Sequence, residues 1–153
     1  MAVRPLVLHP DPRLREVCAP VPRGADHAAL IADLFETLYA AGGRGLAAPQ
    51  IGVGVRVFVM DAWWKTGGAA PIAFVNPRIA GRAKAVQIGE EACLSIPGQA
   101  RRVARPDWVE LDWTDAQGAT RHDRFAGIEA AIVCHEIDHL DGILILDHPD
   151  MPE

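Results

Sequence analysis

The chain has 153 residues, a length typical of one domain, so we expect residues 1–153 to fold as a single domain. Hydrophobic residues make up 50% of the chain and charged residues 23%, as in ordinary globular proteins, and its apolar runs are too short to cross a membrane. The formal net charge is −5 and lysines and arginines form no cluster, which argues against a direct nucleic-acid site.

The N-terminal part of the chain, residues 1–24, is rich in proline and predicts an extended arm with turns. Its apolar run, residues 3–8, is short and interrupted by a proline, unlike a secretory signal. The chain has three cysteines, Cys18, Cys93 and Cys134. An odd number of cysteines without such a signal favours reduced thiols. We therefore expect a cytoplasmic protein.

Two helices are expected, one in each half of the chain. Apolar residues recur at helical spacing from Ala28 to Ala41, with Asp26 as the expected N-cap and Gly42 just after the end. A second apolar helix surrounds residues 135–139 and is expected to stop near Gly142.

Between the two helices the sequence predicts strands, beyond a glycine-rich segment at residues 42–54. They are expected where β-branched and aromatic residues gather, over residues 55–61, 72–75, 86–95, 108–113 and 119–125. The last two flank Asp115–Gly118, which is typical of a hairpin turn. Residues 96–98 read as a turn and residues 143–146 as a final short strand. Strands between two separated helices indicate the α+β class.

The most informative pattern is His135-Glu136-Ile137-Asp138-His139 in the second helix. Positions four apart lie on one helix face, so the two imidazoles could hold one metal ion, and Glu136 could reach a water on it. The alternative is a pair of ordinary histidines. The apolar surroundings disfavour that alternative, because buried imidazoles are costly unless something satisfies them. Metal, water and carboxylate together suggest hydrolysis.

A hydrolytic site of the zinc type needs a third protein ligand and an open position for water. Cys93 is a candidate because a strand meets a turn there, and a thiol beside a metal loses its proton. Spacing alone leaves open that Cys93 is a buried structural cysteine. Cys134 would point about 100° away from His135 around the helix, so we interpret it, like Cys18, as structural.

Three motifs resemble those of the peptide deformylases, which remove the N-formyl group from newly made proteins. The motifs are Gly43–Gln50 (GRGLAAPQ), Glu91–Ser95 (EACLS) and His135–Leu140 (HEIDHL). Their order and spacing match the family over nearly the whole chain, and the segment Val7–Arg15 is similar to the family's start. The resemblance implies antiparallel β-sheets packed around a central C-terminal helix that carries the metal motif, plus an N-terminal helix.

The resemblance also implies a set of catalytic residues. Cys93, His135 and His139 would hold one divalent metal ion, commonly Fe(II) in the family, with Zn(II), Ni(II) or Co(II) as substitutes. Glu136 would act as the general base. The side-chain amide of Gln50 and the backbone N–H of Leu94 would stabilise negative charge on the formyl oxygen.

The implied substrate is a formyl-methionyl peptide that binds as an added strand. The residues expected to bind it are Arg44, Gly45, Glu91, Ala92, Ile128, Ala131 and Ile132. Two of them depart from the family pattern. Arg44 replaces an apolar residue and could attract a carboxylate group, and Ala92 replaces a glycine, which would disfavour a positive φ.

Many bacterial relatives continue into a C-terminal helix that contacts the ribosome, so the end of this chain at Glu153 predicts weak or transient ribosome association. Two alternatives to a deformylase remain. A peptidase using His148 as third ligand would keep its metal after Cys93→Ala. A non-catalytic relative would keep the metal for structure or bind formylated peptides without turnover, and Arg44 and Ala92 are the features that support it.

Overall fold

The computed structural model describes residues 2–153. Five antiparallel strands form the main sheet, in the spatial order β1 (Gly45–Ala47), β2 (Val57–Met60), β3 (Ile72–Arg82), β6 (Trp108–Thr114) and β7 (Thr120–Ala126). A separate antiparallel pair consists of β4 (Val86–Cys93) and β5 (Ile96–Pro106). The helices are α1 (Ala28–Ala41) and α2 (Ile128–Leu140). The predicted α+β class is therefore confirmed.

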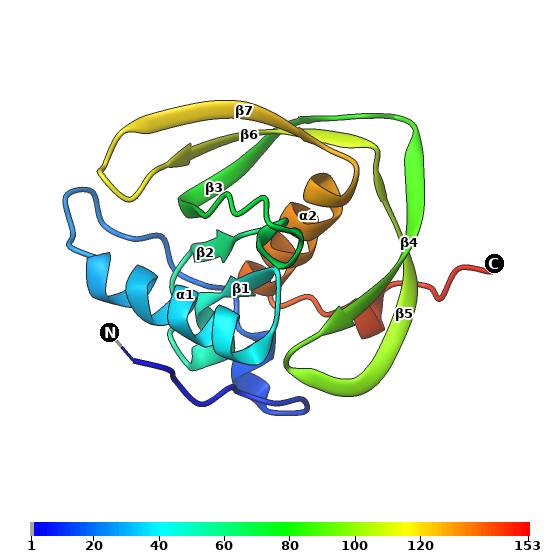
Figure 1. The fold of residues 1–153 in the computed structure, drawn as a ribbon, viewed down its shortest axis with the longest axis horizontal. Helices are drawn as coiled ribbons and strands as arrows, with labels where there is room; N and C mark the ends of the chain where they lie inside the picture. Colours follow the sequence, from blue (N-terminus) through cyan, green and yellow to red (C-terminus); the bar gives the residue numbers. More distant parts are fainter. Residues whose placement is uncertain (1) are drawn as a thin grey trace.

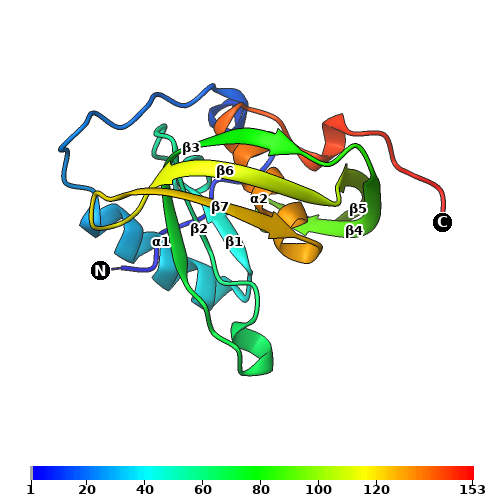
Figure 2. The same ribbon diagram turned by 90° about the horizontal axis from the view of Figure 1, so that it is seen from above.

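Helix α2 lies between the main sheet and the β4–β5 pair, while α1 packs on the other side of the sheet (Figures 1 and 2). Strand β2 shows why. Phe58 and Met60 belong to the core that includes α2, whereas Val57 and Val59 belong to the core that includes α1. Alternate side chains of a strand point to opposite faces, so a continuous apolar strand needs a helix on each face. The central position expected for α2 is confirmed.

A third core cluster joins the N-terminal arm to the region around Cys93. It contains the buried residues Val7, Leu14, Cys93, Ile96, Val103, Leu144 and Ile145. Backbone hydrogen bonds of 2.8 Å run from the amide of Val7 to the carbonyl of Gln50 and from that of His9 to Ser95. The arm thereby ties together two segments that are far apart in the sequence.

Local sequence signals located several elements correctly. Helix α1 spans Ala28–Ala41 as predicted, and Gly42 follows it in the left-handed conformation. The hairpin of β6 and β7 also agrees with the prediction. The predicted N-cap was wrong by one residue, because His27 occupies that position. Asp26 nevertheless accepts a hydrogen bond of 3.0 Å from the backbone N–H of Ala28.

Other predictions were wrong where pairing overrides local signals. Residues 96–98 are not a turn but the start of β5, which tolerates Pro97 because it is paired only with β4. Strand β3 continues through Asn76-Pro77 by a register shift, with Asn76 at φ 49°. The expected strand at 143–146 is instead a loop followed by a 3₁₀ turn, Ile145–Asp147. Among residues 2–153, neither helix has the length and apolarity to cross a membrane.

Candidate metal centre

The side chains of Cys93, His135 and His139 meet at one point between α2 and the end of β4. Both histidines project from α2, one turn apart, and their Nε2 atoms are 3.2 Å from each other. The Sγ atom of Cys93 is 3.4 Å from Nε2 of His139. The three candidate ligand atoms all lie within 4.8 Å of one another. The structure thus brings Cys93 to the pair of histidines that the sequence nominated as one motif.

These separations suit a metal ion of the expected kind. Metal–nitrogen and metal–sulfur bonds of about 2.1 and 2.3 Å in a tetrahedral site place two nitrogens about 3.4 Å apart, and a nitrogen and a sulfur about 3.6 Å apart. The observed 3.2 and 3.4 Å lie close to both values. One thiolate and two imidazoles form a donor set suited to a divalent transition metal, so the residues fit the group.

The electrostatics of the ligands also suit a cation. Burial and the neighbouring His135 lower the pKa of His139 well below its usual range, which leaves its ring neutral. Burial opposes a charge on His135, but Glu136, Cys93 and Glu91 outweigh it and raise the pKa of His135 to about 10. The site therefore attracts one positive charge, which a metal ion would supply in place of the proton.

Glu91 fixes the orientation of the His135 ring. The Nδ1 atom of His135 donates to Glu91 Oε1 at 3.0 Å, so Nε2 is turned toward the other two ligands. Arg105 donates two hydrogen bonds to the same carboxylate, from Nε to Oε2 at 2.9 Å and from Nη2 to Oε1 at 2.8 Å. Burial opposes the charge on Glu91, but Arg105 and His135 outweigh it and lower its pKa to about 2. Glu91 therefore stays ionised and holds the ligand in place.

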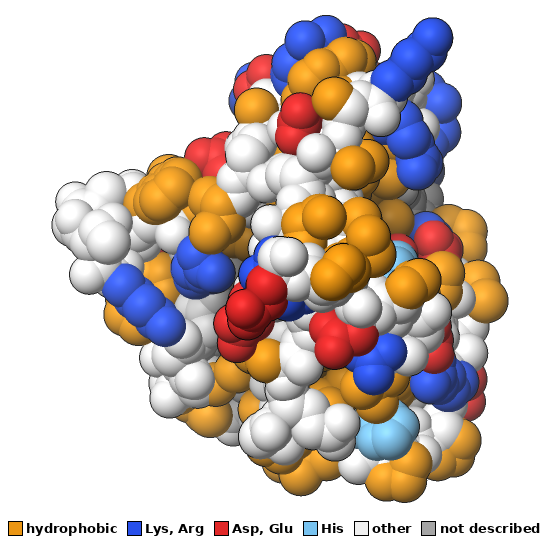
Figure 3. Space-filling view, turned by 90° about the vertical axis from the view of Figure 1, so that its right-hand side faces the viewer, with side chains coloured by type: hydrophobic (Ala, Val, Ile, Leu, Met, Phe, Trp, Pro, Cys, Tyr) orange, Lys and Arg blue, Asp and Glu red, His pale blue; other side chains and the backbone are white. Residues whose placement is uncertain are grey.

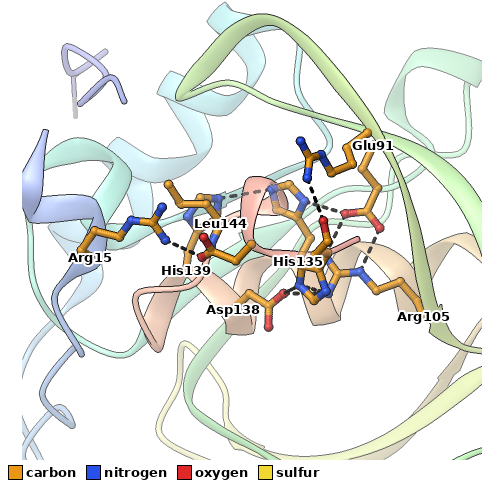
Figure 4. A network of polar contacts seen from close by, with 10 residues as sticks. Arg15, Glu91, Arg105, His135, Asp138, His139 and Leu144 are labelled. Carbon is orange, nitrogen blue, oxygen red and sulfur yellow. Dashed lines mark hydrogen bonds and ion pairs between the residues drawn. The ribbon is translucent and has the colours of Figure 1, made fainter. Parts of the chain in front are cut away.

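The network extends beyond Arg105 to the C-terminal segment (Figure 4). Arg105 donates to Asp138 at 2.7 Å, and Asp138 lies 2.8 Å from Nε2 of His148. The sequence analysis missed Arg105, whose side chain is only 5% exposed. The signal was its position in β5 two residues after the buried Val103, on the same strand face.

His148 is engaged by Asp138 and lies outside the metal cluster. Among the described residues 2–153, Cys93, His135 and His139 form the single group of three or more potential ligands that lie close enough together to hold a metal ion. This geometry contradicts the peptidase alternative, in which His148 is the third ligand. Cys134 is buried, and burial raises its pKa to about 11, as expected of a structural thiol.

Glu136 lies beside the ligands in a setting suited to proton transfer. It is 4% exposed, and within the described part of the chain its Oε1 atom has no hydrogen-bond partner. Burial raises the pKa of Glu136 to about 7, and the positive charge of a bound metal would favour the ionised form. A carboxylate with a pKa near neutrality can both accept and release a proton at physiological pH.

Gln50 presents its amide hydrogens to the same site. Its Oε1 atom accepts a hydrogen bond of 3.0 Å from the backbone N–H of Ala47, which fixes the orientation of the amide. The Nε2 atom therefore faces inward, 3.1 Å from Ser95 Oγ and 3.7 Å from Cys93 Sγ. Gln50 is a buried donor aimed at the metal ligands.

A cavity of about 500 Å³ opens onto this group. Gln50, Leu94, His135 and Glu136 line it. Its walls also contain all the residues expected to bind substrate, which are Arg44, Gly45, Glu91, Ala92, Ile128, Ala131 and Ile132. Ala92 causes no backbone strain, because its φ is not positive; among residues 2–153, Asn76 is the single non-glycine residue with a positive φ. The cavity lies between two strands, β1 and β4, that are each paired on one edge only.

Comparisons with known proteins agree with this site. Residues 3–153 match the family model described as Polypeptide deformylase. A peptide deformylase of Rhizorhabdus wittichii is 42% identical over 154 residues, covering 97% of this chain and 87% of that protein. One of Brucella suis is 42% identical over 149 residues, covering 97% of this chain and 85% of that protein.

Solved structures show the same likeness. The peptide deformylase of Thermotoga maritima superposes with a TM-score of 0.91 at 32% identity, covering 99% of this chain and all (100%) of that one. A peptide deformylase of Acinetobacter baumannii with Met-Ala-Ser bound has a TM-score of 0.89 at 29% identity, covering 97% of this chain and 99% of that one. The chain belongs to the polypeptide deformylase family.

Proposed function

We propose that this deformylase hydrolyses the formyl amide of formyl-methionyl peptides with a divalent metal ion held by Cys93, His135 and His139. The observation that carries the proposal is the convergence of these three ligand atoms, within 4.8 Å of one another, beside a buried carboxylate and a cavity of about 500 Å³. The Acinetobacter baumannii relative binds Met-Ala-Ser, the kind of peptide that deformylation leaves behind. The products are formate and a peptide with a free amino terminus.

Fe(II) is the metal we assign to the site, with Zn(II), Ni(II) and Co(II) as substitutes that the same donors accept. When bound, a divalent ion supplies Lewis-acid polarisation and lowers the pKa of water. The protein's part is to fix the ligand geometry. Glu91 and Arg105 do so by holding His135 through its Nδ1 atom.

Glu136 acts as the general base and then as the general acid. Its carboxylate accepts the proton of the attacking water and later delivers it to the methionine nitrogen as the formyl carbon–nitrogen bond breaks. Burial raises its pKa to about 7 in the metal-free protein, above the usual range of a carboxylate, which favours delivery of the proton in the second step. A carboxylate with an ordinary pKa would be a poorer acid in the second step.

Gln50 and Leu94 stabilise the charge that develops on the formyl oxygen. The Nε2 atom of Gln50 already points at the ligands, 3.7 Å from Cys93 Sγ. Leu94 follows Cys93 directly and lines the cavity, so its backbone N–H is the second proposed donor. Donors that are in position before the reaction stabilise the transition state without a cost of reorganisation.

The peptide lies extended between the free edges of β1 and β4. Each edge offers unpaired backbone groups to an added strand, and Gly45 allows close approach. Glu91 and Ala92 lie along the β4 side and Arg44 at the rim. The methionine side chain packs against apolar residues of α2 that line the cavity: Ile128, Ala131 and Ile132.

The substrate class places the activity where formyl-methionyl chains are made. We therefore infer a cytoplasmic enzyme that meets ribosomes transiently. The test of the proposed function is formate release by metal-loaded protein from formyl-Met-Ala-Ser, compared with acetate release from acetyl-Met-Ala-Ser. We expect the formyl peptide to be hydrolysed and the acetyl peptide not to be, and we expect a chelator to abolish the formate release. Binding of the metal without formate release would favour the non-catalytic alternative.

A further inference from the structure

Among residues 2–153, two cations on the rim of the cavity have no acidic partner. Arg44 and Lys65 line the cavity and are exposed. The third cation of the lining, Arg105, has a side chain that is 5% exposed and pairs with Glu91 and Asp138. His135, which also lines the cavity, pairs with Glu91. The Lys65 ammonium lies 5.6 Å from the centroid of the Trp64 ring, a weak cation–π contact, so the charges of Arg44 and Lys65 are both available to an acidic ligand.

Arg44 lies between two glycines, Gly43 and Gly45, so it carries the side chain of this three-residue segment of the rim. A Cβ atom on Gly43 would lie 2.8 Å from Leu94 Cδ1, and one on Gly45 would lie 2.7 Å from Glu136 Oε2. Neither neighbour can carry a side chain without displacing a residue of the site. The carbonyl of Arg44 accepts a hydrogen bond of 2.9 Å from the backbone N–H of Asp61, which anchors the loop.

Lys65 reaches the same loop from the β2–β3 connection. Trp64 Nε1 donates to the carbonyl of Gly43 at 2.8 Å and so fastens the 3₁₀ turn Trp64–Thr66 onto the loop. The ammonium group of Lys65 lies 4.0 Å from the place that a Cβ on Gly42 would occupy. The Lys65 ammonium therefore lies beside Gly42, two residues before Arg44 in the same loop.

The two cations lie on one side of the cavity, across from an acidic residue. The chain as a whole carries a net charge of −5, and the opposite wall of the cavity includes the exposed Glu90. Figure 3 shows basic side chains on the projecting left-hand part of one face and acidic side chains toward its middle. The cavity therefore distinguishes charge along its rim and can select a charged ligand group.

We propose that Arg44 and Lys65 select formyl-methionyl peptides that carry an Asp or Glu side chain in the first or second position after methionine. This inference rests on the proposed function. The formyl group and methionine occupy the inner end of the cavity beside Glu136, so the following residues leave past Gly45 and Arg44. An extended chain advances about 3.3 Å per residue, which brings these positions within reach of both cations.

The test compares kcat/KM for the amidated peptides formyl-Met-Asp-Ser, formyl-Met-Asn-Ser and formyl-Met-Lys-Ser. For the wild type we expect the Asp peptide to exceed the Asn peptide by about fivefold, chiefly through KM, because exposed ion pairs give small gains. The preference should fade in about 0.5 M salt. Arg44→Gln should weaken the Asp-to-Lys ratio and Arg44→Glu should invert it, while Lys65→Gln weakens it in part.

Lys84→Gln is the matched control, because Lys84 is exposed and lies outside the cavity lining; it should leave the ratio unchanged. Equal kcat/KM for the Asp, Asn and Lys peptides would overturn the inference while leaving the deformylase function intact. Absence of turnover with all three would overturn both. Formyl-Met-Asn-Ser as a free acid tests the other source of a carboxylate, and a gain there without one for the Asp peptide would also contradict the proposal.

Discussion

The carboxylate of Glu136 lies against the backbone of Gly45. A Cβ atom on Gly45 would be 2.7 Å from Glu136 Oε2 and 2.9 Å from Ile132 Cγ2, both closer than such atoms approach. Helix α2 and strand β1 therefore pack so closely that the Glu136 carboxylate occupies the space that a side chain at position 45 would need. The position of the proposed base depends on a residue that contributes no side chain.

Replacing Gly45 with alanine should therefore push Glu136 out of position. We expect Gly45→Ala to lower kcat by about a hundredfold or more, the range that one general base contributes. Metal content should stay at the wild-type level, because the ligands are not touched. Gly54→Ala is the control, since a Cβ on Gly54 meets nothing within 4 Å. Wild-type kcat in Gly45→Ala would mean that the carboxylate position does not matter.

Removing the thiol of Cys93 should remove the metal. A site reduced to two imidazoles falls below the three protein ligands of a hydrolytic centre, so Cys93→Ala should bind metal at least about a hundredfold more weakly. Elemental analysis after gel filtration measures the metal bound per chain. Cys134→Ala, which removes another buried thiol, should keep one ion per chain. A fully metallated Cys93→Ala would refute the ligand assignment.

Arg105 should matter for stability because it neutralises buried acids. Arg105→Met leaves Glu91 and Asp138 without their main partner and should lower the free energy of unfolding by about 3–5 kcal/mol. Arg78→Met removes a pair whose arginine side chain is 70% exposed, and should cost less than about 1 kcal/mol. Urea unfolding of both variants with metal chelated makes the comparison. Similar losses would show that burial of the network is unimportant.

The lowered pKa of Glu91 predicts how stability depends on pH. The pKa falls from 4.5 to about 2 in the folded protein, so the carboxylate stabilises the fold fully above pH 4.5 and progressively less as the pH falls toward 2. A difference of about 2.5 units corresponds to about 3 kcal/mol. In denaturant unfolding measured from pH 6 down to pH 2, metal-free wild type should therefore lose about 3 kcal/mol more stability than Glu91→Gln. Parallel curves would contradict the assignment.

Local patterns predicted those features that depend on neighbours in the sequence. The helix at Ala28–Ala41 follows from its periodicity, and the pairing of His135 with His139 follows from their spacing on one turn. Strand β5 was missed because Pro97-Gly98 signals a turn locally, while hydrogen bonds to β4 keep the segment extended. Such pairing cannot be inferred from a short window.

The candidate site divides in the same way. Cys93 could not be distinguished from a structural cysteine by spacing, because its proximity to His139 depends on how β4 packs against α2. Arg105 lies 14 residues from Glu91 in the sequence and 33 from Asp138, so its role depends on tertiary contacts. Resemblance to the family nominated the three candidate ligands, whereas the residues that hold them in place emerged from the structure.

The most direct test of the account is formate release from formyl-Met-Ala-Ser by Fe(II)- or Ni(II)-loaded wild type, measured beside Glu136→Gln. Both proteins should bind one metal ion per chain, because glutamine keeps the shape of the side chain. The account predicts turnover by the wild type and a loss of at least about a hundredfold in Glu136→Gln, which cannot carry the proton. Equal formate release by both proteins, or none by metal-loaded wild type, would contradict it.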